Sequence, residues 1–111
     1  MNKILLTVII ILAVTTVKAQ ENPATVLASK IAQKMKDSLS LTTEQMQSIY
    51  TINMQLHQQK MAARQQYAGN PSLGNYIQKI ENTRDSLYRP VLTDEKYQLY
   101  KSKKRNLVSN N

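Results

Sequence analysis

The chain has 111 residues and a formal charge of +8, from 15 Lys and Arg against 7 Asp and Glu. It contains no cysteine, which excludes a disulfide framework, thiolate metal ligands and a lipid-modified N-terminal cysteine. Gly69 and Gly74 are its only glycines, so the sequence has no glycine-rich phosphate loop.

Residues 1–19 have the pattern of a cleavable signal peptide. Lys3 supplies positive charge, residues 4–17 are an apolar run broken only by threonines, and residues 17–19 include the small side chains that a signal peptidase reads. The run of 14 residues is short for a bilayer span, which takes about 20 apolar residues. We therefore expect export to the periplasm, with an uncleaved anchor as the alternative.

Residues 20–111 would form a single domain with a formal charge of +6, because cleavage removes two lysines and no acid. A chain of 92 residues has a thin core, and pairing as a homodimer would offset that weakness. A basic balance usually indicates a nucleic-acid partner, but an exported protein does not ordinarily meet the genome, so export argues against that partner. Anionic membrane surfaces, acidic polypeptides or a charged sensor domain fit the basic balance better.

Helical spacing of apolar residues dominates the mature chain, and strand-like alternation is absent. Asn22 followed by Pro23 predicts an N-cap with proline at the first helical position. Apolar side chains then recur every four residues as far as Leu39, so the first helix should end at residues 38–40.

Residues 41–45, Leu-Thr-Thr-Glu-Gln, form a complete start signal for a second helix. The Thr42 hydroxyl can accept the N–H of Gln45, and the Gln45 side chain can accept the N–H of Thr42, which together make a capping box. Leu41 is placed to pack on Met46 as a hydrophobic staple. This helix should run over residues 43–67.

Two apolar stripes follow the predicted second helix. The main stripe consists of Met46, Ile49, Ile52, Leu56, Ala63 and Tyr67. The narrower stripe consists of Tyr50, Met54 and Met61, with His57 between the two. A helix with two apolar faces needs two partners, or one partner and a ligand. Because Met and Tyr suit adaptable surfaces, the narrower stripe is the candidate client-binding surface; packing on the first helix or on a dimer mate is the alternative.

The third and fourth predicted helices follow a clear break. Residues 69–71, Gly-Asn-Pro, predict the end of the second helix and a start like the one at the first helix. The third helix carries apolar residues from Leu73 to Tyr88, with Arg84 at an intervening position, and Pro90 ends it.

The fourth predicted helix begins like the second, with Leu92 as the staple residue and Thr93 as the cap. Lys96 stands where the earlier start has glutamine, and an ammonium group cannot accept the N–H of the cap. We therefore expect the reciprocal half of this capping box to be missing. Cations crowd the end of the helix: Lys101, Lys103, Lys104 and Arg105.

Those four cations have two interpretations. Positive side chains near a helix C-terminus complement its dipole, each contributing about 0.3–1 kcal/mol. In the functional alternative, the four cations attract acidic clients or lipid head groups by long-range electrostatics. Contact with a membrane surface is therefore part of this hypothesis.

The two Leu-Thr helix starts, 51 residues apart in a small exported helical chain, resemble the Spy/CpxP family of periplasmic proteins, which is recognised by a repeated Leu-Thr-x-x-Gln motif. Leu41, Thr42 and Gln45 match the motif in full, whereas Leu92 and Thr93 match it without the glutamine. The resemblance implies four helices arranged in hairpins, often as an antiparallel homodimer shaped like a shallow cradle. It also implies ATP-independent chaperoning of unfolded or partly folded clients. Other members of the wider group bind zinc or modulate a membrane sensor kinase.

The sequence offers little for catalysis or metal binding. His57 is the only histidine, so one subunit cannot build a His-rich zinc site. The serines have no histidine–carboxylate partner at a recognisable spacing. The acidic pairs Asp94/Glu95 and Glu81/Asp85 fit helix-dipole and i,i+4 roles. We therefore expect no enzymatic activity, no cofactor and no metal.

Together these patterns predict an all-α protein with four helices around a long central helix, paired as an antiparallel homodimer. The favoured hypothesis is an ATP-independent periplasmic chaperone or envelope stress protein that binds unfolded or partly folded polypeptides through an apolar and basic surface. The alternative is a regulatory interaction protein that docks on a membrane sensor or another envelope component. A metal-responsive binding protein is a third and weaker hypothesis.

Overall fold

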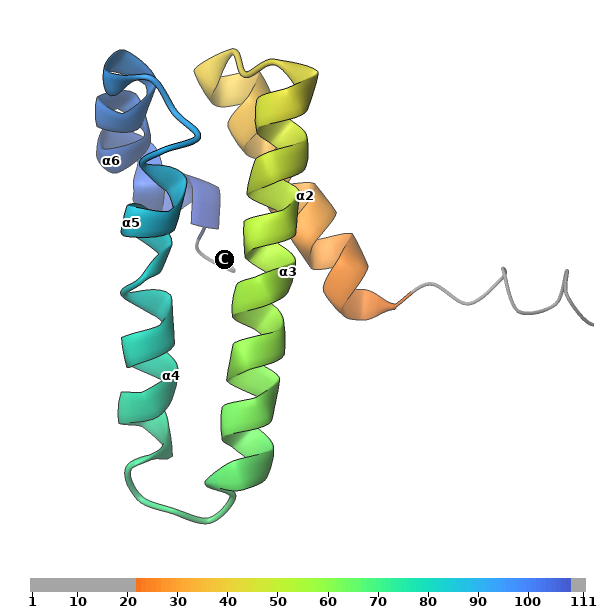
Figure 1. The fold of residues 1–111 in the computed structure, drawn as a ribbon, viewed down its shortest axis with the longest axis vertical. Coiled ribbons are helices and arrows are strands. Elements are labelled where there is room, and N and C mark those ends of the chain that lie inside the picture. Colours follow the sequence, from red (N-terminus) through yellow and green to blue (C-terminus); the bar gives the residue numbers. More distant parts are fainter. Residues whose placement is uncertain (1–21, 109–111) are drawn as a thin grey trace, which may run out of the picture.

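The computed structural model describes residues 22–108, which form five helices and no strand (Figure 1). In chain order these are α2 (Pro23–Leu39), α3 (Thr43–Gln66), α4 (Leu73–Glu81), α5 (Arg84–Tyr88) and α6 (Asp94–Val108). The predicted all-α fold is confirmed. The predicted signal peptide, residues 1–19, lies outside the described residues. None of the helices in residues 22–108 has the length and apolar character needed to cross a bilayer.

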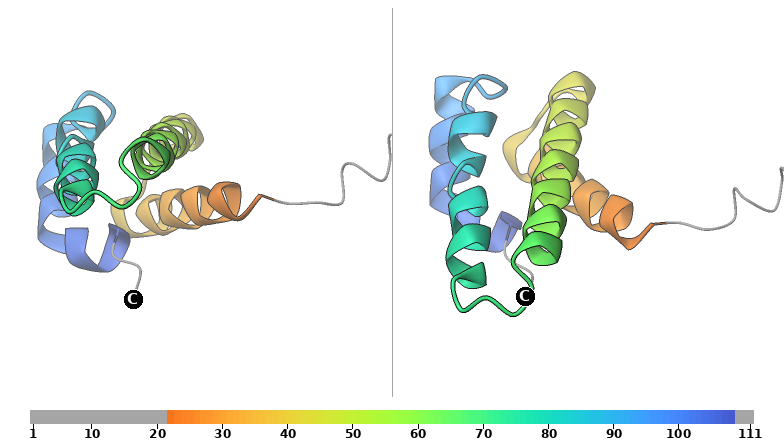
Figure 2. Two further views of the ribbon diagram at one scale, coloured as in Figure 1. Left: turned by 90° about the horizontal axis from the view of Figure 1, so that it is seen from below. Right: turned by 60° about the horizontal axis from the view of Figure 1, so that its bottom comes forward.

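The helices form a hairpin that is covered on one side. α3 runs antiparallel to α4 and α5, and α2 and α6 both lie behind this pair in the view of Figure 1. The view from below in Figure 2 shows α2 and α6 on the same side of the hairpin. The opposite side of the hairpin is covered by no helix of residues 22–108.

The core lies between α2, the first half of α3, α5 and α6. Its buried side chains are Ile31, Ala32, Met35, Leu39, Leu41, Ile49, Tyr88, Leu92, Tyr100 and Leu107. The apolar residues of the predicted first helix and of the main stripe on the second therefore face each other. Leu41 and Leu92, the two predicted staple residues, are both part of this core.

Helix α2 begins and ends as its sequence requires. The Asn22 side chain accepts the N–H of Ala24 at 2.9 Å, and Pro23 is the first helical residue. The helix ends at Ser40, which is left-handed with φ 55°, and the Leu41 N–H then reaches the carbonyl of Lys36 at 3.1 Å. A left-handed residue with a Cβ costs about 1–2 kcal/mol, so the surrounding contacts must hold Ser40 in place.

The predicted capping box of α3 is confirmed. The Thr42 hydroxyl accepts the N–H of Gln45 at 3.1 Å, and the Gln45 side chain accepts the N–H of Thr42 at 3.0 Å. At α6, the Thr93 hydroxyl accepts the N–H of Lys96 at 3.3 Å, and the Lys96 ammonium lies elsewhere. The second box therefore has one half only, as the sequence predicts.

The two Leu-Thr starts bind each other. The Gln45 amide donates to the carbonyl of Val91 at 3.2 Å, and the Lys96 ammonium donates to the carbonyl of Ser40 at 2.8 Å. In each case the fifth residue of one start reaches the carbonyl just before the leucine of the other. The repeated start therefore joins the beginnings of α3 and α6 across the fold.

The prediction of one continuous third helix is wrong in two details. The helix begins at Leu73 because Asn70 and Pro71 form a turn, in which the Asn70 side chain accepts the N–H of Ser72 at 2.8 Å. It also breaks after Glu81, giving α4 and α5. At the break, the Thr83 hydroxyl and N–H both bond to the carbonyl of Ile80, at 2.7 and 3.1 Å, which ends the α4 ladder.

Candidate binding surface

The narrower stripe on α3 does not form one continuous exposed surface. Tyr50 is half-buried and packs against the core, so it belongs to the fold of the subunit. Met54 is also half-buried, whereas the Met61 residue is 46% exposed. His57 is half-buried and lines a small cavity between α2 and α3. Of the three predicted client-binding residues on this helix, Met61 is therefore the one most open to a partner.

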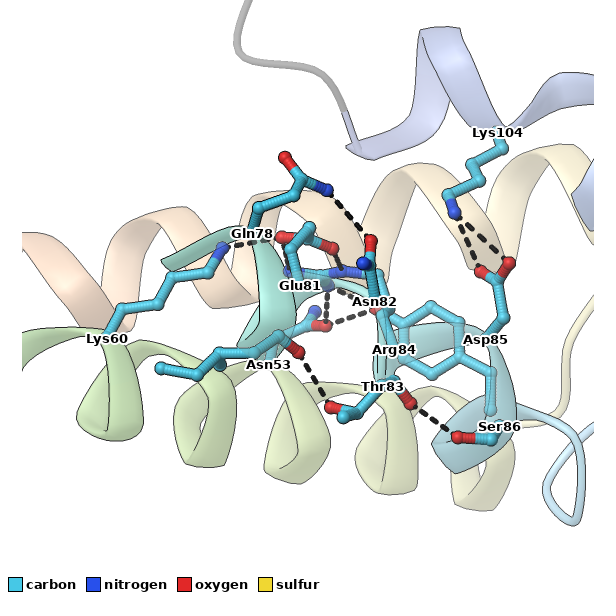
Figure 3. A network of polar contacts seen from close by, with 12 residues as sticks. Asn53, Lys60, Gln78, Glu81, Asn82, Thr83, Arg84, Asp85, Ser86 and Lys104 are labelled. Carbon is cyan, nitrogen blue, oxygen red and sulfur yellow. Dashed lines mark hydrogen bonds and ion pairs between the residues drawn. The ribbon is translucent and has the colours of Figure 1, made fainter. Parts of the chain in front are cut away.

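Part of the basic run on α6 is bound within the subunit. Lys101 donates to the Asp85 carboxylate on α5 at 2.7 Å. Lys104 donates to the same carboxylate at 2.9 Å (Figure 3). The Tyr100 hydroxyl donates to the same carboxylate at 2.9 Å. Burial alone would raise the pKa of Asp85, but these hydrogen bonds outweigh it and lower the pKa to about 2. Lys101 and Lys104 therefore join α5 to α6.

The other two cations of the run are less constrained. Lys103 reaches the carbonyl of Ser38 at 3.5 Å, the outer limit of a hydrogen bond. Arg105 is exposed and makes no ion pair in residues 22–108. These two side chains are the part of the basic run that is open to an acidic partner.

A buried polar cluster lies between α3 and α5 (Figure 3). Arg84 is only 5% exposed, and Asn53 is 4% exposed. The Arg84 guanidinium donates to the Asn53 side chain at 2.8 Å and to the Tyr88 hydroxyl at 2.7 Å, and it forms a two-point contact with Glu81. Lys60 on α3 pairs with the same Glu81 carboxylate.

The cluster also reaches α2, because the Asn53 amide donates to the carbonyl of Ala28 at 3.1 Å. Asn53 therefore connects three helices at one point. The positions of both residues in the sequence hint at this arrangement, because Arg84 lies on the apolar stripe of the third predicted helix. Asn53 also lies at helical spacing from Ile49 and Leu56 on the facing stripe.

Glu81 and Arg84 each stabilise the ionised form of the other. Burial alone would raise the pKa of Glu81, but the hydrogen bonds and charges of Arg84 and Lys60 outweigh it and lower that pKa. Burial opposes the charge on Arg84, yet its carboxylate partner raises the pKa of the guanidinium above its usual value. Burial raises the pKa of the Tyr88 hydroxyl to about 12. None of these shifts moves a pKa toward neutral pH, where a general acid or base needs it to be. The cluster is therefore suited to joining helices.

A cavity of about 90 Å³ adjoins this cluster, between α2 and the hairpin. Ala28 and Leu27 of α2 line one wall, and His57, Lys60 and Arg84 line the other. No buried side-chain nitrogen or oxygen of the described residues lacks a hydrogen-bond partner. The cavity therefore has no buried donor or acceptor in need of a ligand.

The hairpin made by α3 and α4 has a second hollow, a groove of about 450 Å³. We call it the hairpin groove. It is lined by Gln59, Ala62, Ala63, Gln66, Tyr67, Tyr76, Lys79, Ile80 and Thr83. The rings of Tyr67 and Tyr76 are stacked across the two helices, with centroids 3.9 Å apart and planes 7° from parallel. This groove has no local signature in the sequence, because the pairing of α3 with α4 creates it.

Within residues 22–108 no group of three or more His, Cys, Asp or Glu side chains is arranged to hold a metal ion. No protein-family model, curated protein or solved structure matches the chain. A functional interpretation therefore rests on the residues described above.

Proposed function

We propose that the protein is an exported, ATP-independent chaperone or envelope stress protein of the Spy/CpxP type, which binds unfolded or partly folded polypeptides and catalyses no reaction. One observation carries the proposal: the apolar side chains of the α3–α4 hairpin are left partly exposed. None of the nine residues of α4 is buried, although Leu73, Tyr76, Ile77 and Ile80 recur at helical spacing. These four side chains are half-buried, and an apolar helical face that the subunit covers only in part leaves surface for a partner.

The charge of the chain supports the same proposal. The mature chain would carry a formal charge of +6. Positive charge speeds encounters with acidic polypeptides, and apolar contact then retains them. A surface of this kind discriminates little between clients, which suits a chaperone more than a receptor for one ligand.

We further propose that two subunits pair as an antiparallel homodimer. A small subunit with a thin core would gain buried apolar area by pairing with a mate. Sedimentation of the purified protein should give a mass near twice that of one subunit. N-terminal sequencing of the periplasmic form should begin at Gln20, the residue after the proposed cleavage site.

The direct test is suppression of aggregation. Several unrelated model clients are diluted from denaturant with and without the protein, in the absence of nucleotide. We expect light scattering to fall for most clients at comparable molar amounts of protein and client. Failure on every client, together with tight binding to one envelope component, would favour the regulatory alternative. Zinc titration of the wild type and His57→Ala addresses the metal-responsive alternative: no zinc-dependent difference between them would remove it.

A further inference from the structure

The hairpin groove has a distinct charge pattern. Residues 45–80, which span most of α3 and nearly all of α4, contain no Asp or Glu. The next acid along the chain is Glu81, whose carboxylate binds Lys60 and Arg84 and which lines the cavity on the α2 side. Lys79 is exposed, is the one charged residue that lines the groove, and makes no ion pair in residues 22–108.

The walls of the groove are suited to a polypeptide. The lining includes Ala62, which is exposed, and Ala63, which is buried, and we call this small apolar pair the alanine floor. The stacked rings of Tyr67 and Tyr76 also line the groove. The exposed amides of Gln59 and Gln66 lie along it, where they can bond to the backbone of an extended segment.

We propose that the hairpin groove binds an extended apolar segment of a client polypeptide that also carries an acidic residue. An aliphatic or aromatic side chain occupies the alanine floor, and the acidic side chain pairs with Lys79. This inference rests on the proposed function, because it identifies the occupant as a client segment. A concave floor between two helices receives a single side chain, whereas docking on a flat bilayer would call for apolar side chains that project outward.

The test uses two fluorescent peptides and the protein as purified from cells. One peptide contains Leu, Phe and Asp, and the other has Lys in place of every Asp. Binding is measured by fluorescence anisotropy at fixed ionic strength, because exposed charges are screened by salt. Circular dichroism melts establish that each variant is folded.

Two variants alter the groove, and each has a matched control on the hairpin. Lys79→Glu reverses the charge in the groove, and Arg64→Glu makes the same reversal in the last turn of α3, outside the groove. Ala62→Glu puts an acid on the exposed floor, and Gln65→Glu adds the same charge at an exposed position that does not line the groove. We expect both groove variants to weaken binding of the acidic peptide at least fivefold, and both controls to change it less than twofold. Lys79→Glu should also bind the lysine peptide more tightly than the wild type does.

Other outcomes would overturn the inference. Equal losses in Lys79→Glu and Arg64→Glu would mean that net charge alone attracts the peptide. Phosphatidylglycerol vesicles that bind the wild type but not Ala62→Glu, with the peptide unaffected, would make the groove a membrane contact. A dimer that Ala62→Glu converts to a monomer would assign the groove to a second copy of the chain.

The same variants separate this inference from the proposed function. If Ala62→Glu suppresses client aggregation as well as the wild type does, the groove is not the client site and the chaperone proposal stands. If the wild type binds the peptide in the groove yet suppresses aggregation of no client, the chaperone proposal fails and the peptide site stands.

Discussion

Lys96 on α6 donates a hydrogen bond from its ammonium group to the backbone carbonyl of Ser40, 2.8 Å away and 56 residues earlier in the chain. Ser40 is the left-handed residue that ends α2. The contact therefore ties the start of α6 to the turn between α2 and α3. On the other side of the same junction, the Gln45 amide donates to the carbonyl of Val91.

The symmetry of this junction predicts how position 96 responds to substitution. Lys96→Ala removes the donor to Ser40 and should cost about 0.5–1.5 kcal/mol, the usual net value of a hydrogen bond. Lys96→Gln should be at least as stable as the wild type, because a glutamine can accept the N–H of Thr93 and donate to Ser40, as Gln45 does at α3. Urea unfolding measures both. Equal losses in the two variants would show that the charge of Lys96 is what matters.

The two threonine caps should differ in how much they contribute to the free energy of unfolding. Thr42→Ala breaks a complete capping box and should cost about 1 kcal/mol. Thr93→Ala should cost less, because Thr93 has a single longer contact to the N–H of Lys96 and no reciprocal bond. Thermal melts of the two variants provide the comparison. Equal shifts of the melting temperature would contradict the ranking.

Much of the fold could be predicted because it depends on local signals. The caps at Asn22 and Thr42 are set by side chains within three residues of the helix start, so the sequence contains all the necessary information. The break at Thr83 could not be predicted in this way. Thr83 is exposed, and an exposed threonine in a helix can bond either to water or to the carbonyl three residues earlier, so the sequence alone does not decide between the two.

The binding surface was less predictable than the fold. Periodicity placed Tyr50 and Met61 on the same narrow stripe, yet one packs against the core and the other is exposed. α2 covers only part of α3, and nothing in the spacing of residues says where that cover ends. The interaction between Asp85 and Lys101 likewise depends on where α6 packs against α5, which is a tertiary property.

Arg84 should be essential to the stability of the subunit. Arg84→Met removes the donors to Glu81, Asn53 and Tyr88, of which Asn53 and Tyr88 are buried. Losing one partner of a fully buried ion pair costs about 3–5 kcal/mol, and because Glu81 is partly exposed and keeps Lys60, the cost here should lie at or below the lower end of that range. Arg105→Met is the control, because Arg105 is exposed and should contribute less than about 0.5 kcal/mol. Urea unfolding of both variants at neutral pH gives the difference; similar losses would mean that the cluster stabilises little.

Because of Asp85, the free energy of unfolding should depend on pH over a defined acidic range. Its pKa is about 2 in the folded protein against an ordinary 3.8, so the unfolded chain takes up its proton first as pH falls. The stabilisation is fully present above about pH 4 and is lost between pH 4 and pH 2. Asp85→Asn should therefore be less stable than the wild type at pH 7 and should lose less stability on acidification. Urea midpoints at pH 7, 4, 3 and 2 measure this. Parallel curves for the two proteins would mean that Asp85 is not the group responsible.

Substitutions at Tyr50 and Met61 should separate an effect on stability from an effect on client binding. Tyr50→Ala removes an aromatic ring that packs against the core and should cost about 2 kcal/mol or more in the free energy of unfolding. Met61→Ala removes a side chain of a residue that is 46% exposed and should cost less than about 1 kcal/mol. If this part of α3 contacts clients, Met61→Ala should weaken aggregation suppression about twofold, the effect of a peripheral apolar contact, and Met61→Leu should retain it. Full suppression by Met61→Ala would remove Met61 from the client surface. A Tyr50→Ala variant as stable as the wild type would show that Tyr50 is available for binding after all.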